Sequence, residues 1–173
     1  RLSRRVTLVT PNVPELAILA EEPRATSWAE VLAQAERVSV RFAVTVIAKG
    51  GHLEGDVVPD AVVDASAPIG ERVVEVPGAR FATTNTHGTG CSLSSALATL
   101  LPGAESVADA LRQAKRWLAE SIRHGADLKV GQGNGPVSHF AGLWERGGIQ
   151  TRPSPVQVMD DWWGETADAR DAI

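Results

Sequence analysis

Residues 27–48 read SWAEVLAQAERVSVRFAVTVIA and join a helix pattern to a strand pattern. Ser27 followed by Glu30 is a capping-box sequence, which is typical of a helix start. Apolar residues then recur at helical spacing: Val31, Leu32, Ala35, Val38 and Phe42. Residues 44–48 follow as a short apolar run, and a similar run at residues 6–9 precedes the helix. Strand, helix and strand in this order predict a parallel unit with a right-handed crossover.

Further elements are expected on both sides of this unit. They are a short helix near Pro14, an antiparallel edge hairpin of residues 61–64 and 72–76, a helix over residues 92–101, and a longer helix between the Ser106–Asp109 capping pattern and Gly125. The expected fold class is therefore α/β, with a mostly parallel sheet, flanking helices and an antiparallel edge hairpin. Residues 1–150 are assigned to this domain. Residues 151–173 are interpreted as a proline-containing linker and the beginning of a second helical segment.

Composition excludes several classes of protein. The chain has 173 residues, enough for one domain, and its formal net charge of −4 gives no electrostatic reason to expect nucleic acid or an anionic membrane as a partner. One cysteine excludes an internal disulfide and suits a reducing compartment. No apolar run approaches the roughly 20 residues of a membrane helix, and the first residues do not resemble a signal peptide. A cytoplasmic location is therefore expected.

The first candidate site residues follow the two expected parallel strands. Asn12 and Glu15 come after residues 6–9, and Lys49 comes after residues 44–48. The carboxyl edge of an open parallel sheet is where ligands bind. A carboxylate near an amide oxygen can hold Mg²⁺ through its waters, and a lysine can reach phosphate oxygens. The alternatives are a helix cap with a first-turn acid, which is compatible with metal binding, and a surface lysine before a turn.

The stretch THGTGCS, residues 86–92, lies between a strand-like run and an expected helix. Gly88 and Gly90 lack side chains, so backbone N–H groups around Thr89 can approach an anion at the positive end of the helix dipole. Cys91 falls in the first helical turn, where the dipole lowers the pKa of a thiol. The stretch is not a Walker A loop, because no lysine follows the second glycine. The alternative is a glycine-rich turn with a small buried cysteine.

These three motifs are expected at the ligand-binding end of the sheet, each after a strand. Together they supply a carboxylate for a metal ion, a lysine for phosphate and a group of amides for the transferred group. These are the groups that phosphoryl transfer requires, so the sequence favours that reaction.

Four stretches in this order, TPNVPE, VIAKGGHLEGD, NTHGTGCSLSSALATLL and GNGPVSHF, resemble the hydroxymethylpyrimidine/phosphomethylpyrimidine kinases of thiamine biosynthesis. These enzymes belong to the ribokinase-like superfamily, whose fold is Rossmann-like. The resemblance covers residues 6–144, and HGTGCSLSSA is its most specific part. It implies phosphorylation of 4-amino-5-hydroxymethyl-2-methylpyrimidine and its monophosphate, with ATP and Mg²⁺ as cofactors.

The resemblance also implies roles for the residues after the first two strands. Asn12 and Glu15 match a motif associated with Mg²⁺ and phosphate, with Glu15 as the metal candidate. Lys49 matches a lysine near the nucleotide phosphates. Thr86 joins Lys49 and Asn12 as a cofactor-binding candidate.

The glycine stretch matches the catalytic loop of these kinases. Gly88, Thr89 and Gly90 match the anion hole. Cys91 matches the position where the catalytic base acts on the acceptor hydroxyl. Either a thiolate accepts that proton, or the loop amides supply most of the effect by stabilising charge.

The resemblance further implies that the domain is incomplete at the N-terminus, because the family's first half carries much of the pyrimidine pocket. The tail MDDWWGETADARDAI resembles the start of a fused thiaminase II-like domain. Two other functions remain open. One is a pyridoxal or pyridoxine kinase of the same superfamily, and the other is a non-catalytic nucleotide-binding module. A homo-oligomer is also possible.

Overall fold

The computed structural model describes residues 6–140 and residue 142. It divides into two compact units. The first contains residues 1–80 and 94–115, and the second contains residues 81–93 and 116–173. The predicted linker and second helical segment at residues 151–173 lie outside the described part of the chain.

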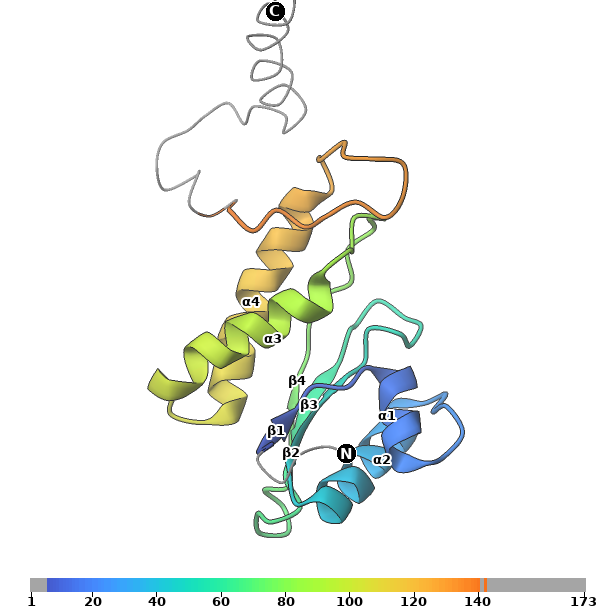
Figure 1. The fold of residues 1–173 in the computed structure, drawn as a ribbon, viewed down its shortest axis with the longest axis vertical. Helices are drawn as coiled ribbons and strands as arrows, with labels where there is room; N and C mark the ends of the chain where they lie inside the picture. The colour runs from blue at the N-terminus through green and yellow to red at the C-terminus, as the bar shows by residue number, and fades with distance from the viewer. Residues whose placement is uncertain (1–5, 141, 143–173) are drawn as a thin grey trace, which may run out of the picture. The chain divides into compact units, whose positions relative to one another are not determined.

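The first unit is built on a four-stranded sheet in the order β1-β2-β3-β4 (Figure 1). The strands are β1 (Leu8–Val9), β2 (Thr45–Lys49), β3 (Asp60–Val63) and β4 (Val73–Val76). β1 pairs with β2 in parallel, whereas β2–β3 and β3–β4 are antiparallel. The α/β class, the parallel unit and the edge hairpin are confirmed. The described sheet is mixed, because the hairpin supplies its two antiparallel pairings.

Two helices connect β1 to β2, namely α1 (Val13–Ala20) and α2 (Trp28–Phe42). The predicted capping box of α2 is present. The Ser27 hydroxyl accepts from the Glu30 N–H at 3.3 Å, and the Glu30 carboxylate accepts from the Ser27 N–H at 3.3 Å. These bonds satisfy N–H groups that have no partner within the helix. At the other end, Ala43 has a φ of 51°, which turns the chain out of α2 towards β2.

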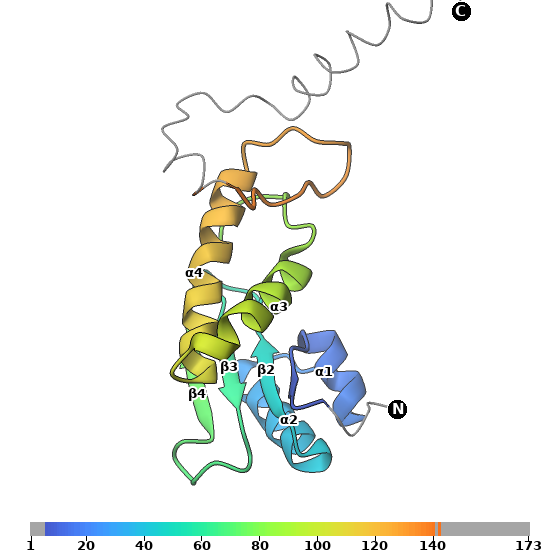
Figure 2. The same ribbon diagram turned by 60° about the vertical axis from the view of Figure 1, so that its left-hand side comes forward.

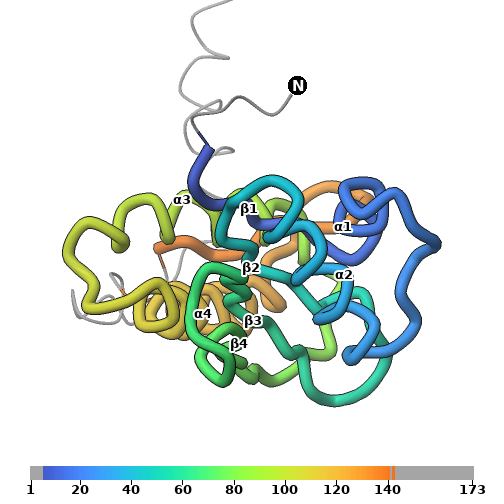
Figure 3. Tube along the Cα trace, turned by 90° about the horizontal axis from the view of Figure 1, so that it is seen from below, coloured from blue at the N-terminus to red at the C-terminus, as the bar shows by residue number. Residues whose placement is uncertain are grey.

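The helices α1 and α2 cover one face of the sheet (Figures 1 and 3). The core on this face consists of buried apolar side chains: Val13, Leu16, Ala25, Val31, Ala35, Val38, Val46, Ala48, Ala61 and Val63. Burying one valine or leucine side chain contributes roughly 1.5–3 kcal/mol, so this layer is a major source of the unit's stability. Side chains alternate along a strand, so Ile47 and Val62 lie on the opposite face, where they are also buried.

Residues 94–115 belong to the same unit and include parts of two further helices. The helices are α3 (Thr89–Leu100) and α4 (Val107–Gly125), and the short 3-10 helix η1 (Leu101–Gly103) lies between them (Figure 2). The predicted cap of α4 is confirmed by a 3.1 Å bond from the Asp109 N–H to the Ser106 hydroxyl. No helix in the described ranges is long and apolar enough to cross a membrane.

The strand that precedes the glycine loop in the chain is the one predicted over residues 72–76, and the structure shows it as β4 (Val73–Val76). No described residue between Val76 and Thr89 belongs to a strand, and only isolated bridge residues occur there. Local bonds hold this segment instead, such as the 3.0 Å bond from the Asn85 N–H to the Thr83 hydroxyl. Short polar side chains of this kind compete with sheet pairing for the backbone, so the chain runs from β4 to the glycine loop without a further strand. The following helix α3 also begins earlier than expected, at Thr89 rather than at residue 92.

Candidate functional site

The parallel pairing of β1 with β2 brings two candidate residues together. Asn12 and Lys49 form an isolated parallel bridge at the carboxyl ends of these strands, and the Lys49 N–H donates to the Pro11 carbonyl at 3.1 Å. Glu15 lies in the first turn of α1, directly after Asn12. The structure therefore places an amide, a carboxylate and an ammonium group on neighbouring segments at one edge of the sheet.

Asn12 and Glu15 form the capping box of α1. The Asn12 Oδ1 accepts from the Glu15 N–H at 2.9 Å, and the Glu15 Oε2 accepts from the Asn12 N–H at 2.8 Å. The helix-cap interpretation of both residues is therefore correct. The box uses only one oxygen of the exposed Glu15 carboxylate, so the other oxygen remains available to a cation.

The donors at this edge fit a magnesium ion that is held mainly by water and phosphate. Glu15 supplies one carboxylate. The described residues contain no group of three His, Cys, Asp or Glu side chains that could hold a metal ion. Mg²⁺ commonly keeps several waters and takes one or two protein carboxylates together with substrate phosphates. A single carboxylate therefore suits a metal ion that arrives with a phosphate ligand.

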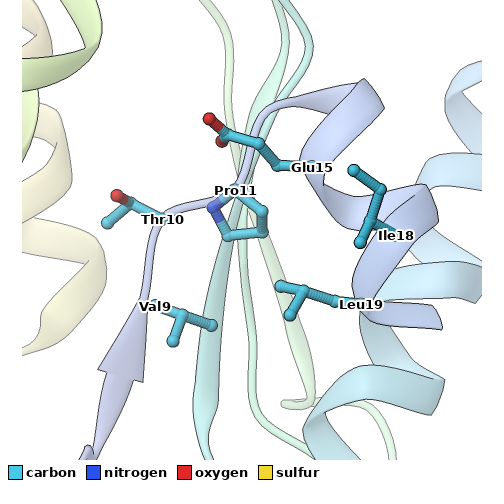
Figure 4. Close-up of a pocket in the computed structure, with 6 residues that line it drawn as sticks. All are labelled: Val9, Thr10, Pro11, Glu15, Ile18 and Leu19. Atoms are coloured by element: carbon cyan, nitrogen blue, oxygen red, sulfur yellow. The ribbon is translucent and has the colours of Figure 1, made fainter. Parts of the chain in front are cut away.

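An open pocket of about 360 Å³ lies between β1 and α1 (Figure 4). Its lining residues are Val9, Thr10, Pro11, Glu15, Ile18 and Leu19. Glu15 lies at one end of the pocket, and Val9 and Leu19 lie at the other. The pocket thus offers a largely apolar surface beside the Glu15 carboxylate. Lys49 is not among its lining residues.

The chain turns sharply after Lys49. The Gly50 N–H donates both to the Pro59 carbonyl at 2.8 Å and to the Asp60 Oδ1 at 3.0 Å. A Cβ atom at Gly50 would overlap the Pro59 carbonyl oxygen, so this close approach requires glycine. These two bonds, one to Asp60 at the start of β3 and one to Pro59 just before it, therefore fix the direction in which the chain leaves Lys49.

Asp60 is in turn paired with Lys115 of α4 in the interior. The Lys115 ammonium lies 2.9 Å from the Asp60 Oδ2 and donates to the carbonyls of Val58 and Val76 at 2.7 Å each. These three contacts use all the donors of the ammonium group. The Lys115 and Asp60 side chains are only 13% and 7% exposed.

This buried pair was not predicted from the sequence. Two signals were available: Asp60 opens an otherwise apolar strand, and Lys115 directly follows the buried Ala114 on α4. Neither signal identifies the partner, because the two residues lie far apart in the chain.

In the second unit, the glycine loop forms the turn into α3. Gly88 has a φ of 84°, in the left-handed region that favours glycine. Thr89 and Gly90 are the first two residues of α3, and the Thr89 N–H makes a long 3.4 Å bond to the Thr86 carbonyl. Cys91 is the third helical residue and is exposed, so the alternative of a buried cysteine is wrong.

Residues 133–139, GNGPVSH, are hydrogen-bonded to the glycine loop and the start of α3 within the second unit. The His87 N–H donates to the Gly135 carbonyl at 3.0 Å. The Ser92 hydroxyl, next to Cys91, is hydrogen-bonded to the His139 Nε2 at 2.7 Å. The His139 ring centroid also lies 5.8 Å from that of Trp117 on α4. Ser92 and His139 were not singled out from the sequence, because their pairing depends on segments distant in the chain.

The predicted site residues thus fall into two groups. Asn12, Glu15 and Lys49 belong to the first unit, whereas Thr86 and residues 88–91 belong to the second. Within the first group, Asn12 bridges Lys49 and caps the helix that carries Glu15. That both groups meet around one transferred phosphate stays a prediction.

Comparisons with known proteins agree on one family. The sequence profile described as phosphomethylpyrimidine kinase matches residues 1–138. The thiamine biosynthesis multifunctional protein ThiED of Corynebacterium glutamicum is 48% identical over 139 residues, which cover 80% of this chain and 18% of that protein. The hydroxymethylpyrimidine/phosphomethylpyrimidine kinase of Escherichia coli is 41% identical over 144 residues, which cover 83% of this chain and 52% of that protein.

A solved structure supports the same fold. The pyridoxal kinase of Staphylococcus aureus in complex with AMP-PCP matches with a TM-score of 0.71 and 27% sequence identity, over 81% of this chain and 49% of that chain. This match confirms the ribokinase-like α/β fold. The chain spans about half the length of these two kinases. Because the profile covers most of the sequence, the chain belongs to the phosphomethylpyrimidine kinase family.

Proposed function

We propose that this chain is the nucleotide-binding and catalytic-loop part of a kinase that phosphorylates 4-amino-5-hydroxymethyl-2-methylpyrimidine and its monophosphate with ATP and Mg²⁺. The observation that carries the proposal is the bridge between Asn12 and Lys49. This bridge places the start of α1, which carries Glu15, beside Lys49 at the carboxyl ends of β1 and β2. That is the edge where α/β sheets bind ligands. The 41% identity to a kinase of this name supports the choice of substrate.

The first unit holds the nucleotide phosphates in this proposal. Lys49 places its positive charge near the phosphate oxygens, and Asn12 contacts the nucleotide. Thr86, which belongs to the second unit, is proposed as a further nucleotide contact. Glu15 holds Mg²⁺ through the carboxylate oxygen that the capping box leaves open. Bound magnesium supplies charge neutralisation on the phosphates.

The glycine loop serves the transfer step. The acceptor hydroxyl oxygen forms a bond to the γ-phosphorus while the bond from that phosphorus to the bridging oxygen of ADP breaks. The amides of Gly88, Thr89 and Gly90 stabilise charge on the transferred group, and the Cys91 thiolate takes the hydroxyl proton. The exposed position of Cys91 in the first turn of α3 supports this role, because the thiol is accessible to an acceptor.

The complete substrate site is proposed to require more than this chain, which covers 52% of the Escherichia coli kinase. We therefore expect the chain alone to behave as a nucleotide-binding module without turnover. The intact protein, with the other half of the kinase domain, is expected to be active. Pyridoxal or pyridoxine is the second candidate substrate, favoured by the match to a pyridoxal kinase at 27% identity.

Two features of the whole protein are also proposed. Its tail from residue 158 is the start of a thiaminase II-like segment, and the protein acts in the cytoplasm. The large size of the Corynebacterium glutamicum protein, of which this chain covers 18%, supports a multidomain parent. Reading the coding sequence on both sides of residues 1–173 tests the domain arrangement.

Two measurements test the proposed function. On the intact protein, ADP release is expected with the pyrimidine substrate but not with pyridoxal, and the reverse result would select the vitamin B6 alternative. On the chain alone, calorimetry with Mg·ATP is expected to detect binding that Lys49→Met weakens about tenfold, or 1.4 kcal/mol. Arg41→Met is the matched control, because Arg41 is an exposed cation on α2, paired with Glu21. Absence of nucleotide binding by the unmodified chain would contradict the proposal.

A further inference from the structure

The helix α3 begins after a residue that cannot cap it with a side chain. That residue is Gly88, which has no side-chain oxygen to accept from the N–H groups of the first turn. The first turn of α3 also has no acidic side chain. The Thr89 N–H reaches the Thr86 carbonyl only over a long 3.4 Å bond. Helix ends fray, so the turn that carries Cys91 needs support from outside the helix.

Ser92 connects this turn to such a support. Its N–H donates to the Gly88 carbonyl at 2.9 Å, and its hydroxyl lies 2.7 Å from the His139 Nε2. Ser92 is only 8% exposed, whereas the neighbouring Cys91 is exposed. The serine therefore joins the backbone of the first turn to a side chain outside the helix and leaves the Cys91 thiol accessible.

His139 is itself held by the part of α4 that belongs to the second unit. The N–H of the buried Ser138 donates to the Ser121 carbonyl at 2.9 Å. The His139 ring packs against Trp117, with 5.8 Å between the ring centroids and 32° between the ring planes. Ser121 and Trp117 lie one turn apart on α4, and the Ser121 hydroxyl donates to the Trp117 carbonyl at 3.0 Å. The helix therefore supports both the backbone before His139 and its ring.

The bond between Ser92 and His139 does not require one ionisation state of the imidazole. A serine hydroxyl can donate or accept, a neutral imidazole can do either according to its tautomer, and an imidazolium donates. The end of a glutamine side chain also carries both a donor and an acceptor, so glutamine can make the same bond. Leucine fills space but makes no hydrogen bond. Comparing glutamine with leucine at residue 139 therefore separates the hydrogen bond from packing.

We propose that His139 is a positioning residue for the transfer step, because through Ser92 it holds the first turn of α3, with Cys91 and the loop amides, in a fixed geometry. The inference rests on the proposed kinase function. A side-chain cap would occupy an N–H group of the first turn. A bond to the Ser92 hydroxyl occupies none, so the amides stay open to the transferred group while the turn is held.

Steady-state kinetics of the intact kinase test this inference. In His139→Leu, kcat is expected to fall about tenfold, while the KM values for ATP and the pyrimidine change less than about twofold, because the misplaced groups act on the transition state. His139→Gln is expected to recover most of the lost kcat. Ser92→Ala is expected to lower kcat as much as His139→Leu, and the double variant no further, because both changes remove the same hydrogen bond.

Amide hydrogen exchange of the chain alone gives a second readout that does not depend on activity. The Ser92 N–H is expected to exchange faster in His139→Leu, because its bond to the Gly88 carbonyl lies in the released turn. Unchanged exchange along α4 shows that the variant is folded. His124→Leu is the matched control, because His124 lies in the same unit and is hydrogen-bonded to its neighbour Arg123 at 3.1 Å. It is expected to change neither kcat nor the exchange of Ser92.

The outcomes separate this inference from the proposed function. If the unmodified kinase transfers no phosphate, the proposed function fails and the inference fails with it. If the kinase is active, three kinetic results would overturn the inference alone. These are an unchanged kcat in His139→Leu, no recovery in His139→Gln, and a double variant whose loss is the product of the two single losses. Unchanged exchange of the Ser92 N–H in His139→Leu would also overturn it.

Discussion

Replacement of Lys115 by methionine is expected to destabilise the first unit strongly. Methionine keeps an unbranched side chain of similar length but removes the ammonium group. The Asp60 side chain is 7% exposed, and its carboxylate would lose its cationic partner at 2.9 Å. The carbonyls of Val58 and Val76 would each lose a 2.7 Å donor.

The size of the effect follows from this burial. Removing one partner of a buried ion pair costs about 3–5 kcal/mol, because the remaining charge is left without compensation. Loss of the two carbonyl bonds places Lys115→Met in the upper part of that range, so we expect about 4–5 kcal/mol. Domains of this size are commonly stable by about 5–15 kcal/mol, so the variant is expected to be close to unfolding.

Urea unfolding followed by tryptophan fluorescence measures the loss, because Trp28 reports on the first unit through its 2.8 Å bond to Glu75 on β4. Arg41→Met is the control, because it breaks an ion pair whose side chains are 46% and 71% exposed. Such exposed pairs contribute about 0–1 kcal/mol.

A double variant separates the buried charge from a general packing defect. Lys115→Met with Asp60→Asn removes the unpaired charge and keeps an oxygen that accepts from Gly50. We expect it to recover about half of the loss, or roughly 2 kcal/mol. A cost for Lys115→Met no larger than that of Arg41→Met would refute the reasoning. So would a double variant less stable than Lys115→Met.

Three further outcomes are expected. Gly50→Ala should destabilise the chain by about 2–3 kcal/mol in urea unfolding, because its Cβ would overlap a backbone carbonyl, whereas Gly51→Ala, with 3.7 Å to its nearest neighbour, should be close to neutral. Cys91→Ser in the intact kinase should lower kcat more than about tenfold, or 1.4 kcal/mol, and a smaller loss would argue against a proton-accepting thiolate. Hydrogen bonds from the Ser66 hydroxyl and N–H hold the pKa of Asp64 below its ordinary value. That stabilisation is present above the unfolded-state pKa of Asp64 and is lost as the pH falls through the folded-state pKa. Ser66→Ala should therefore lower the melting temperature at pH 7 but not at pH 2, and an equal loss at both would contradict this cause.

The elements that were predicted correctly depend on residues close together in the sequence. The caps at Ser27 and Ser106 form between residues three apart, so the sequence pattern contains both partners. The hairpin was predicted from two short apolar runs around a turn. The segment between β4 and the glycine loop forms no further strand, because bonds such as that from the Asn85 N–H to the Thr83 hydroxyl occupy the backbone locally. The buried pair of Lys115 and Asp60 could not be predicted, because the two residues come from segments distant in the chain.

The capping box at α1 shows why sequence alone left the role of Glu15 open. A helix N-terminus and a hydrated magnesium ion both favour a carboxylate, so the same residue satisfies either pattern. In the structure the cap uses Oε2 and holds Glu15 to the backbone of Asn12, which itself bridges Lys49. The cap therefore fixes the Glu15 carboxylate beside the lysine's strand before any ligand is present. A carboxylate fixed in this way loses little conformational entropy when it binds a cation, so the cap favours the metal-binding role proposed for Glu15.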